Sequence, residues 1–365
     1  MKLEAIKEKL QKIIGHAERL AGKHLSLPIL SHLLLVVKNG SLTVRSTNLD
    51  MGIECTLPVK VEREGSVAVP ANVLSSLISN LPNIKNVFLE EKDGKLLVGS
   101  AISKSVIHTS SSDDFPTIPR LQGDSITIDP QILVKGFRSV QYAGALGNLK
   151  PELGSVYMYN DDKDLVFVAT DSFRLAEKRI SLKKELSIPP LLIPIKNTVE
   201  LTRLLEEEKE EVRVYAGKGQ ISIETSGFYV TSRLVEGSFP DYRQIIPKDA
   251  ATEAVVLKED LVNAFKVATL FSDKFNHIKI SVDPKKKQFE LTTRNGDVGE
   301  NNVSLPSALT GSSFEGNFNH RYVSDCLSVL SGDSALFRFS GDGRPLLIQG
   351  VGDATFRYLV MPMNR

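Results

Sequence analysis

Three segments of this 365-residue chain resemble one another, and the threonine that each contains recurs every 123 residues. They are SLTVRSTNLDMGIE from Ser41, DLVFVATDSFRLAEKRI from Asp164 and QFELTTRNGDVGENNVSL from Gln288. Each contains an apolar, strand-like run that ends at a threonine: Thr47, Thr170 or Thr293. Solenoid repeats recur about every 20–50 residues, so a period this long is typical of a whole domain. The sequence therefore predicts three tandem copies of one fold.

Two helices are expected in each copy. The first is predicted to open the copy, because apolar residues recur at helical spacing. These residues are Leu3, Ile6, Leu10, Ile13, Ile14, Ala17 and Leu20, then Leu133, Gly136, Phe137, Val140 and Ala143, then Leu257, Leu261, Ala264, Phe265, Ala268 and Phe271. Asp129-Pro130 is predicted to cap and begin the helix of the second copy. The second helix of each copy follows a break at Pro70, Pro194 or Gly316.

A hairpin is expected after each second helix, over residues 86–100, 212–226 and 335–349, where Asp and Gly supply the turns. The closing motifs at Phe115 and Phe239 are 124 residues apart and keep the same register. We therefore expect an α+β fold of three domains, residues 1–120, 121–247 and 248–365, each with two helices against antiparallel strands. Because no Ser/Gly-rich linker marks either joint, the domains are expected to touch and hold a fixed angle.

Composition excludes several classes of protein. The chain has 45 Lys plus Arg and 44 Asp plus Glu, which rules out a uniformly basic coat but allows one basic face. Only Cys55 and Cys326 are present, and no cleavable signal is recognised, so a reducing cytoplasm is expected. No apolar run approaches the roughly 20 residues that cross a bilayer.

Catalytic and metal-binding patterns are absent from the sequence. It has no GxxxxGK[ST], no GxGxxG after a strand, no HExxH and no CxxC pair, and its six histidines lack ligand spacing. Asp161, Asp162 and Asp164 form the one acidic group that suggests a metal cluster. They fall at an expected hairpin turn, where aspartate is favoured for backbone reasons. We therefore expect neither a metal nor another cofactor.

Four motifs resemble the bacterial sliding clamp, the beta subunit of DNA polymerase III. They are LPILSHLLL at Leu27, ATDSFRLAEKRI at Ala169, SFPDYRQIIP at Ser238 and VMPM at Val360. The resemblance covers the whole chain. It implies three domains of like topology per chain, and two chains closing head to tail into a ring around duplex DNA. It also implies a non-catalytic processivity factor that tethers the DNA polymerase III catalytic subunit and docks the clamp loader, other polymerases and repair proteins.

A ring of this kind holds DNA by topology, so its lining should contact phosphates loosely and read no bases. The candidate lining cations lie on or beside the expected helices: Lys12, Lys23, Lys135, Arg138, Lys196, Arg203, Lys266 and Arg321. Any one of them taken alone is more readily explained as an ordinary solvated residue, and the hypothesis concerns the set. Lys285, Lys286 and Lys287 follow Asp283-Pro284 and are expected in a solvated turn.

The resemblance also implies a pocket for short apolar peptides between the second and third domains. Residue by residue, the matching positions are Leu153, Thr170, Ser172, Phe173, Arg174, Leu175, Pro240, Ile245, Tyr322, Pro345, Val360, Met361, Pro362 and Met363. Leu175, Val360 and Met361 are alternatively core residues, and Arg174 alternatively orders its own loop. Two features depart from the family pattern: Ser172-Phe173 replaces the usual Gly-His, and the chain ends in Asn364-Arg365. Phe173 makes the rim more apolar, so the preference for peptides is expected to shift.

Ring closure needs contacts between the first domain of one chain and the third domain of the next. Val106 and Ile107 on an edge strand, and Leu270 and Phe271 after a helix, are the apolar candidates. All four are alternatively core residues of one chain. Two rival interpretations remain at this point: a multidomain enzyme with a small-molecule cleft at a domain joint, and a monomeric scaffold for protein partners only.

Overall fold

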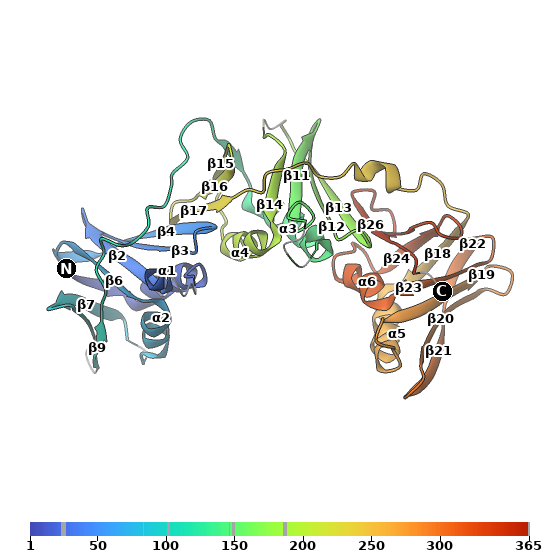
Figure 1. Ribbon diagram of the computed structural model, residues 1–365, viewed down its shortest axis with the longest axis horizontal. Helices are drawn as coiled ribbons and strands as arrows, with labels where there is room; N and C mark the ends of the chain where they lie inside the picture. The colour runs from blue at the N-terminus through green and yellow to red at the C-terminus, as the bar shows by residue number, and fades with distance from the viewer. Residues whose placement is uncertain are drawn as a thin grey trace. The chain divides into compact units, whose positions relative to one another are not determined.

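The computed structural model describes residues 1–22, 27–82, 84–100, 103–145, 147, 150–184 and 188–363 (Figure 1). Contacts within the chain divide it into two compact units. The first unit comprises Met1–Gln131 and Glu200–Leu234, and the second comprises Ile132–Val199 and Val235–Arg365. The middle third of the sequence therefore contributes to both units.

The first unit contains two antiparallel sheets. One has the strand order β5-β1-β7-β8-β9, with β1 Lys2–Ile6, β5 Lys60–Arg63, β7 Asn86–Lys92, β8 Lys95–Gly99 and β9 Lys104–His108. The other has the order β10-β15-β16-β17-β4-β3-β2-β6. Its strands are β2 His32–Lys38, β3 Ser41–Thr47, β4 Met51–Pro58, β6 Gly65–Pro70, β10 Ile126–Ile128, β15 Val212–Gly217, β16 Gln220–Glu224 and β17 Phe228–Arg233.

The second unit also contains two antiparallel sheets. The larger has the order β14-β11-β12-β13-β26-β25-β24-β18-β22. Its strands are β11 Ser155–Asp161, β12 Asp164–Thr170, β13 Arg174–Ser181, β14 Leu191–Pro194, β18 Thr252–Leu257, β22 Ser307–Gly311, β24 Ser334–Phe339, β25 Leu346–Gly350 and β26 Phe356–Val360. The smaller sheet is β21-β20-β19-β23, with β19 His277–Asp283, β20 Gln288–Asn295, β21 Gly299–Leu305 and β23 Phe314–Asn319.

Six α-helices lie in the described ranges: α1 Lys7–Arg19, α2 Ala71–Asn80, α3 Pro130–Val140, α4 Ile195–Leu205, α5 Lys258–Leu270 and α6 His320–Asp325. Helix α1 packs beside α2 and against β3 and β4, and α5 packs beside α6 (Figure 1). The Asp129 side chain accepts the N–H of Gln131 at 2.9 Å, which confirms the expected cap before α3. None of these helices combines the length and apolar character that a bilayer crossing requires.

The antiparallel α+β fold with paired helices and the hairpins β7–β8, β15–β16 and β24–β25 are confirmed. The expectation that a helix opens each copy is wrong for the opening residues. Leu3 and Ile6 belong to β1 and Leu257 ends β18, so each copy opens with a strand and then turns into its helix. In β1 only Leu3 and Ala5 are buried, and this alternation is the two-residue period of a strand.

The repeated threonines mark equivalent turns in the first two copies. Each threonine hydroxyl donates to the carbonyl oxygen four residues later, at 2.7 Å for Thr47 and 2.6 Å for Thr170. The second residue after each threonine has a left-handed φ, 73° at Leu49 and 77° at Ser172. The third copy differs, because the buried hydroxyl of Thr293 has no hydrogen-bond partner among the described residues. The period therefore marks the same hydrogen-bonded turn in the first two copies, whereas in the third copy it marks a position inside β20.

Neighbouring copies are joined by antiparallel strand pairs. In the first unit β4 pairs with β17 from Met51 to Cys55, and in the second β13 pairs with β26 from Arg174 to Lys178. Both joints use the strand after the threonine turn, β4 or β13, and the last strand of the following copy, β17 or β26. The equivalent strands left over are β21 and β9, and each lies at the end of its sheet.

Two glycines on the first helices of their copies allow a matched test of helix–sheet packing. An added Cβ at Gly136 would lie 2.3 Å from the ring of Phe167, whereas at Gly15 nothing lies within 4 Å. We expect Gly136→Ala to lower the free energy of unfolding by about 1–3 kcal/mol through overpacking. Gly15→Ala should raise it by up to about 1 kcal/mol, because alanine favours helix. Chemical denaturation measures both changes, and equal changes would contradict the observed packing.

Candidate functional site

An apolar cavity of about 380 Å³ opens in the second unit. It is lined by Phe173, Asn319, Tyr322, Met361, Pro362 and Met363. These residues come from the β12–β13 turn, the start of α6 and the segment after β26, which are far apart in sequence. The structure therefore brings together five of the pocket residues expected from the sequence, with Asn319 as an addition.

The β12–β13 turn holds Phe173 at the rim of this cavity. The Asp171 carboxylate accepts the N–H groups of Phe173 at 2.9 Å and Arg174 at 3.0 Å. With these bonds and the Thr170 hydroxyl bond, the short turn is fixed by its own side chains. Phe173 nevertheless keeps 61% of its surface exposed. A large aromatic ring on a fixed turn is thus available for contact without an ordering cost to its backbone.

The carboxy-terminal segment forms the opposite wall. The Met361 N–H donates to the Phe173 carbonyl oxygen at 2.8 Å, and the Met363 N–H donates to the Asn317 carbonyl oxygen at 2.8 Å. These two bonds fix the segment between the turn and β23, while the side chains of Met361 and Met363 line the cavity. Methionine side chains are flexible and polarizable, so this wall can adapt to different apolar groups.

Arg174 connects the turn to α6. Its guanidinium lies 4.5 Å from the centre of the Tyr322 ring and hydrogen-bonds Asp171 at 3.1 Å as well as Asp325. Burial opposes its charge, but the Tyr358 phenol and the two carboxylates raise the pKa of Arg174, which therefore stays charged. Burial, and then the negative charge of Asp171, raises the pKa of the Tyr322 phenol. These contacts give Arg174 a structural role beneath the cavity.

The remaining expected pocket residues lie outside the cavity wall. Leu153, Thr170, Leu175, Pro345 and Val360 are buried, and Pro240 and Ile245 are exposed. Leu175 packs with Leu347 and Leu359 in an apolar cluster, and Val360 pairs with Arg174 across the β13–β26 joint. Ser172 holds the left-handed position of the turn. Asn364-Arg365 lies outside the described residues.

Asn319 is not among the pocket residues expected from the sequence, although its position before a helix is a recognisable capping signal. Its side chain accepts the N–H groups of Arg321 and Tyr322 and so caps α6. Asparagine directly before a helix is a recognisable cap, and the expected helix already began close to this position. The capping role places its amide at the cavity rim, where a polar group can orient an otherwise apolar ligand.

The seven described candidate cations are all exposed on helices. They are Lys12 on α1, Lys135 and Arg138 on α3, Lys196 and Arg203 on α4, Lys266 on α5 and Arg321 on α6. Lys12 pairs with Glu207 at 3.0 Å, and Arg203 pairs with Glu200 at 2.6 Å. Lys23 lies outside the described residues. Lys285, Lys286 and Lys287 are exposed at the β19–β20 turn, as expected.

The candidate interface residues divide into two kinds. Val106 on β9 is 53% exposed and Leu270 at the end of α5 is 68% exposed, so both are available for contact. Ile107 is buried at 6% exposure and belongs to the core of its own sheet. Phe271 is partly buried and approaches Gly299 at the start of β21.

No group of metal-binding side chains is found in the parts of the chain that the structure describes. Asp161 and Asp164, at the β11–β12 hairpin, instead form ion pairs with Arg179 on the neighbouring strand β13. Both cysteines are buried thiols, and burial raises the pKa of Cys55 to about 12. These groups therefore serve the fold.

Comparison with known proteins agrees with the fold. The N-terminal, central and C-terminal domain models of the DNA polymerase III beta subunit match residues 1–119, 127–241 and 243–364. Two curated relatives, each named "Beta sliding clamp", are 26% identical in Synechococcus elongatus and 28% identical in Escherichia coli. The alignments cover 100% of this chain and 99% and 100% of those proteins.

A solved structure of the DNA polymerase III subunit beta from Pseudomonas aeruginosa superimposes with a TM-score of 0.93 at 26% identity, over 100% of both chains. Three successive domain models account for nearly all of the sequence, in the order that the internal period requires. With its three tandem modules of antiparallel sheets and paired helices, the chain belongs to the DNA polymerase III beta-subunit family, the bacterial sliding clamps.

Proposed function

We propose that this chain is a DNA sliding clamp, in which two copies close head to tail around duplex DNA and tether DNA polymerase III. The clamp is a non-catalytic processivity subunit of the cytoplasm. Family membership supports the tethering role, because the relatives are named sliding clamps and polymerase subunits. The observation that carries the ring is the pair of unused sheet edges, β9 and β21.

The closure of the ring rests on the equivalence of the joints. Each joint within the chain pairs two kinds of strand. The first kind, β4 or β13, follows the threonine position of one repeat, and the second kind, β17 or β26, is the last strand of the next repeat. In the third repeat the strand of the first kind is β21, and in the first repeat the strand of the second kind is β9. β21 of one chain is therefore suited to pair with β9 of another chain. Pairing would satisfy the backbone groups of both edges, and two such joints per pair of chains leave no edge of these kinds open. Lys104 on β9 and Glu300 on β21 carry opposite charges, and Glu300 also pairs with Arg294 of its own chain at 3.6 Å.

A charge placed at the proposed interface should separate the two chains. We expect Val106→Asp and Leu270→Asp each to shift the assembly from dimer to monomer, because each puts a carboxylate into an apolar contact. Sedimentation velocity measures the mass. Val351→Asp is the control, since Val351 has the same 53% exposure as Val106 but lies on the β25–β26 turn. Variants that remain dimeric would count against this interface. Val106 is preferred to Ile107, because a charge at buried Ile107 would also disturb the sheet.

The helices supply the DNA-facing surface in this proposal. Five of the six described helices carry at least one exposed candidate cation, and α2 carries none. Two chains with six helices each would give twelve lining helices, on the described residues. Mobile lysine and arginine side chains contact phosphates without reading bases, so the ring would be held yet free to slide. The near-neutral composition is consistent with a positive lining inside a neutral or acidic outer surface.

Removing lining charge should shorten retention on DNA. We expect the triple variant Lys135→Gln, Lys266→Gln, Arg321→Gln to leave nicked circular DNA severalfold faster at low salt. The difference should shrink as salt screens the phosphates. The control, Lys285→Gln, Lys286→Gln, Lys287→Gln, removes the same charge from the exposed β19–β20 turn. If both variants behave alike, the chosen helices do not face DNA.

The apolar cavity is proposed as the docking pocket for short linear motifs of polymerases, the clamp loader and repair proteins. Its aromatic, proline and methionine walls suit an extended peptide with large apolar anchors. The ring of Phe173 and the amide of Asn319 provide one apolar and one polar contact at the rim. The other matched positions remain part of the proposed pocket, as contacts or supports beyond the cavity wall, on the resemblance alone: Leu153, Thr170, Ser172, Arg174, Leu175, Pro240, Ile245, Pro345 and Val360.

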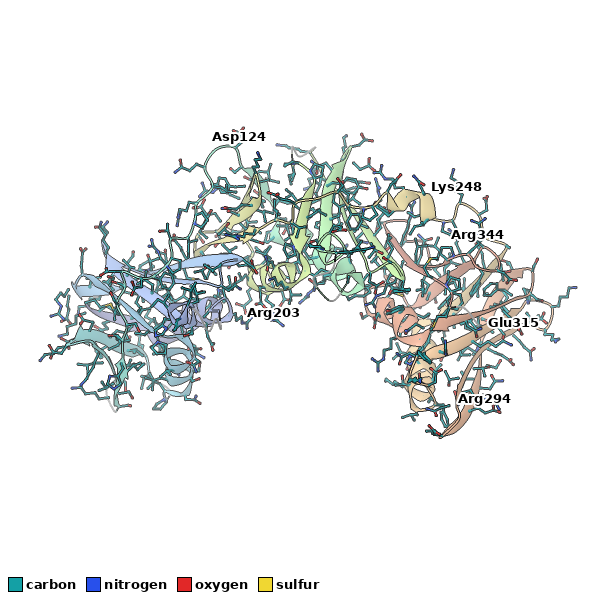
Figure 2. The ribbon with its side chains drawn as sticks, viewed as in Figure 1. Asp124, Arg203, Lys248, Arg294, Glu315 and Arg344 are labelled. Atoms are coloured by element: carbon teal, nitrogen blue, oxygen red, sulfur yellow. The ribbon has the colours of Figure 1, made fainter. Side chains whose placement is uncertain are left out.

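Disrupting the cavity should weaken peptides and leave the ring intact. We expect Met363→Asp to reduce the affinity for an apolar peptide at least tenfold, because the peptide would have to desolvate a carboxylate. Deletion of Asn364-Arg365 should also weaken binding. Fluorescence anisotropy with a labelled peptide measures affinity, and sedimentation verifies the dimer. Asp124→Asn, on an exposed loop of the first unit, is the control (Figure 2). Unchanged affinity in Met363→Asp would show that the pocket is misplaced.

A further inference from the structure

A second, larger cavity lies on one face of the nine-stranded sheet. Its volume is about 630 Å³, within the range of small-molecule sites, and it shares no lining residue with the apolar cavity. Strands β13, β24, β25 and β26 contribute residues to it, and the segment that connects β17 to β18 adds Arg243, Ile246, Pro247 and Lys248. Figure 2 labels Lys248 on this connecting segment. The cavity therefore spans the β13–β26 joint and the connection beside it.

The wall of this cavity carries an excess of positive charge. Five cationic side chains line it against two carboxylates, Glu177 and Asp353. The cations are Arg179, Arg243, Lys248, Arg338 and Arg357. Most proteins separate like charges on this scale unless something compensates them, because close cations repel one another. The compensation within the described chain comes partly from outside the cavity.

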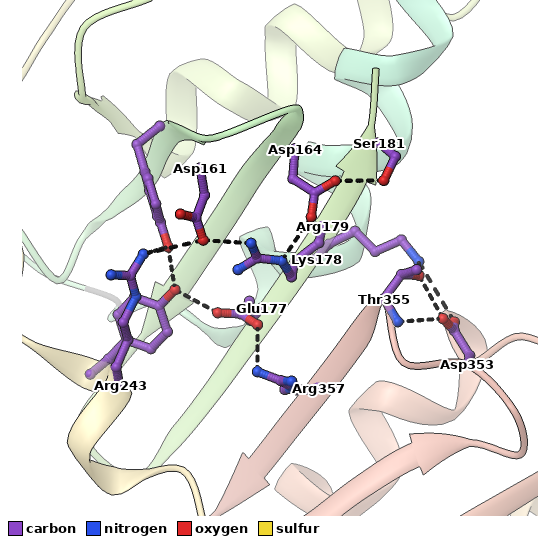
Figure 3. Close-up of polar contacts among 12 residues, drawn as sticks. Asp161, Asp164, Glu177, Lys178, Arg179, Ser181, Arg243, Asp353, Thr355 and Arg357 are labelled. Atoms are coloured by element: carbon purple, nitrogen blue, oxygen red, sulfur yellow. Dashed lines mark hydrogen bonds and ion pairs between the residues drawn. The ribbon is translucent and has the colours of Figure 1, made fainter. Parts of the chain in front are cut away.

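Carboxylates outside the lining hold the arginines in place. Asp161 lies between Arg179 and Arg243 and pairs with both, at 3.5 Å for Arg243 (Figure 3). Asp164 hydrogen-bonds the Arg179 Nε at 3.1 Å and accepts the Ser181 hydroxyl. Asp161 and Asp164 are both absent from the cavity wall. Carboxylates that do not line the cavity thus fix the guanidinium groups before a ligand binds. This lowers the entropic cost of binding.

Arg338 is held in the same way. Its Nε donates to Glu253 at 2.9 Å and its Nη1 to Gln349 at 3.3 Å, and Glu253 also lies outside the lining. A guanidinium has five N–H donors in a planar fork, and the bonds described for Arg179, Arg243 and Arg338 use one or two nitrogens of each. Donors therefore remain on each group, and guanidinium donors are suited to bind phosphate or carboxylate.

Arg357 and Lys248 are weakly compensated, as is Arg243, because its carboxylate partner Asp161 lies 3.5 Å away and also pairs with Arg179. Arg357 reaches Glu177 only at 3.4 Å, and the Tyr242 hydroxyl already donates to the other oxygen of Glu177 at 2.5 Å. Lys248 is exposed, and no ion pair is found for it among the described residues. Leu336, Leu347 and Ile246 add apolar area to the same cavity, which suits the carbon skeleton of an organic molecule.

We propose that this cavity binds a small organic anion that carries at least two phosphate or carboxylate groups. The fixed arginines would take one anionic group, and Arg357 with Lys248 would take another. This site is separate from the peptide pocket and from the DNA-facing helices, and it does not depend on the proposed function. The cavity spans the β13–β26 joint, where the second and third repeats of one chain meet. A bound anion would therefore bridge these two repeats.

Isothermal titration calorimetry on the full-length protein, with inorganic pyrophosphate and with citrate at constant ionic strength, tests the proposal. We expect one saturable site per chain for at least one probe, and the preferred probe identifies phosphate or carboxylate as the ligand chemistry. Lys248→Ala combined with Arg357→Gln should weaken binding at least tenfold. The single variant Lys248→Glu, at an exposed side chain, should weaken it without affecting the fold.

The matched control is Lys287→Ala combined with Arg294→Gln, which removes the same charge from exposed positions of β20 and its turn. It should bind the probe as the unaltered protein does. The proposal is overturned if neither probe gives a saturable site, or if the control and the Lys248 variants lose affinity equally. Thermal unfolding verifies the fold of each variant, and Lys248→Glu alone decides the outcome if the double variant fails to fold.

Discussion

Backbone pairing between strands of neighbouring copies is the interaction on which the rest of the structure depends. A buried N–H or C=O without a partner costs about 1–3 kcal/mol, so a sheet edge must be paired, covered or left in water. β4 and β13 solve this by pairing with β17 and β26. The β13–β26 register sets Arg174 opposite Val360, so the β12–β13 turn and the carboxy-terminal segment meet and form the apolar cavity.

Two cavities of opposite character therefore lie on one joint. The apolar cavity is bounded by a fixed turn and an adaptable methionine wall, whereas the larger cavity is lined by arginines that carboxylates hold from behind. Leu347 lines the larger cavity and packs with Leu175 and Leu359. Leu175 follows Arg174 and Leu359 precedes Val360, so this cluster lies next to the residue pair that brings the walls of the apolar cavity together. The core of the joint thus supports both, which explains why residues expected in a pocket are found buried beneath one.

Much of the fold could be predicted because its signals are local. The Asp93-Gly94 turn and the Asp129 cap each depend on a few neighbouring residues, and the 123-residue spacing of the threonines is visible in the sequence without knowledge of any contact. Strand β1 was missed because Leu3 and Ile6 fit a helical period as well as they fit a short strand. The sequence does not distinguish buried Ile107 from exposed Val106, or buried Val360 from Met361 at the cavity. Which residue of each pair is buried depends on which face of the sheet other segments cover. That coverage is set by distant segments.

Hydrogen–deuterium exchange on β9 and β21, measured over a range of protein concentrations, tests most directly whether these edges pair between copies. If β9 of one copy pairs with β21 of another, amides in both strands should be protected together at high concentration. They should lose that protection together on dilution. Fast exchange in both strands at every concentration, or protection of one strand without the other, would contradict the pairing and with it the closed ring.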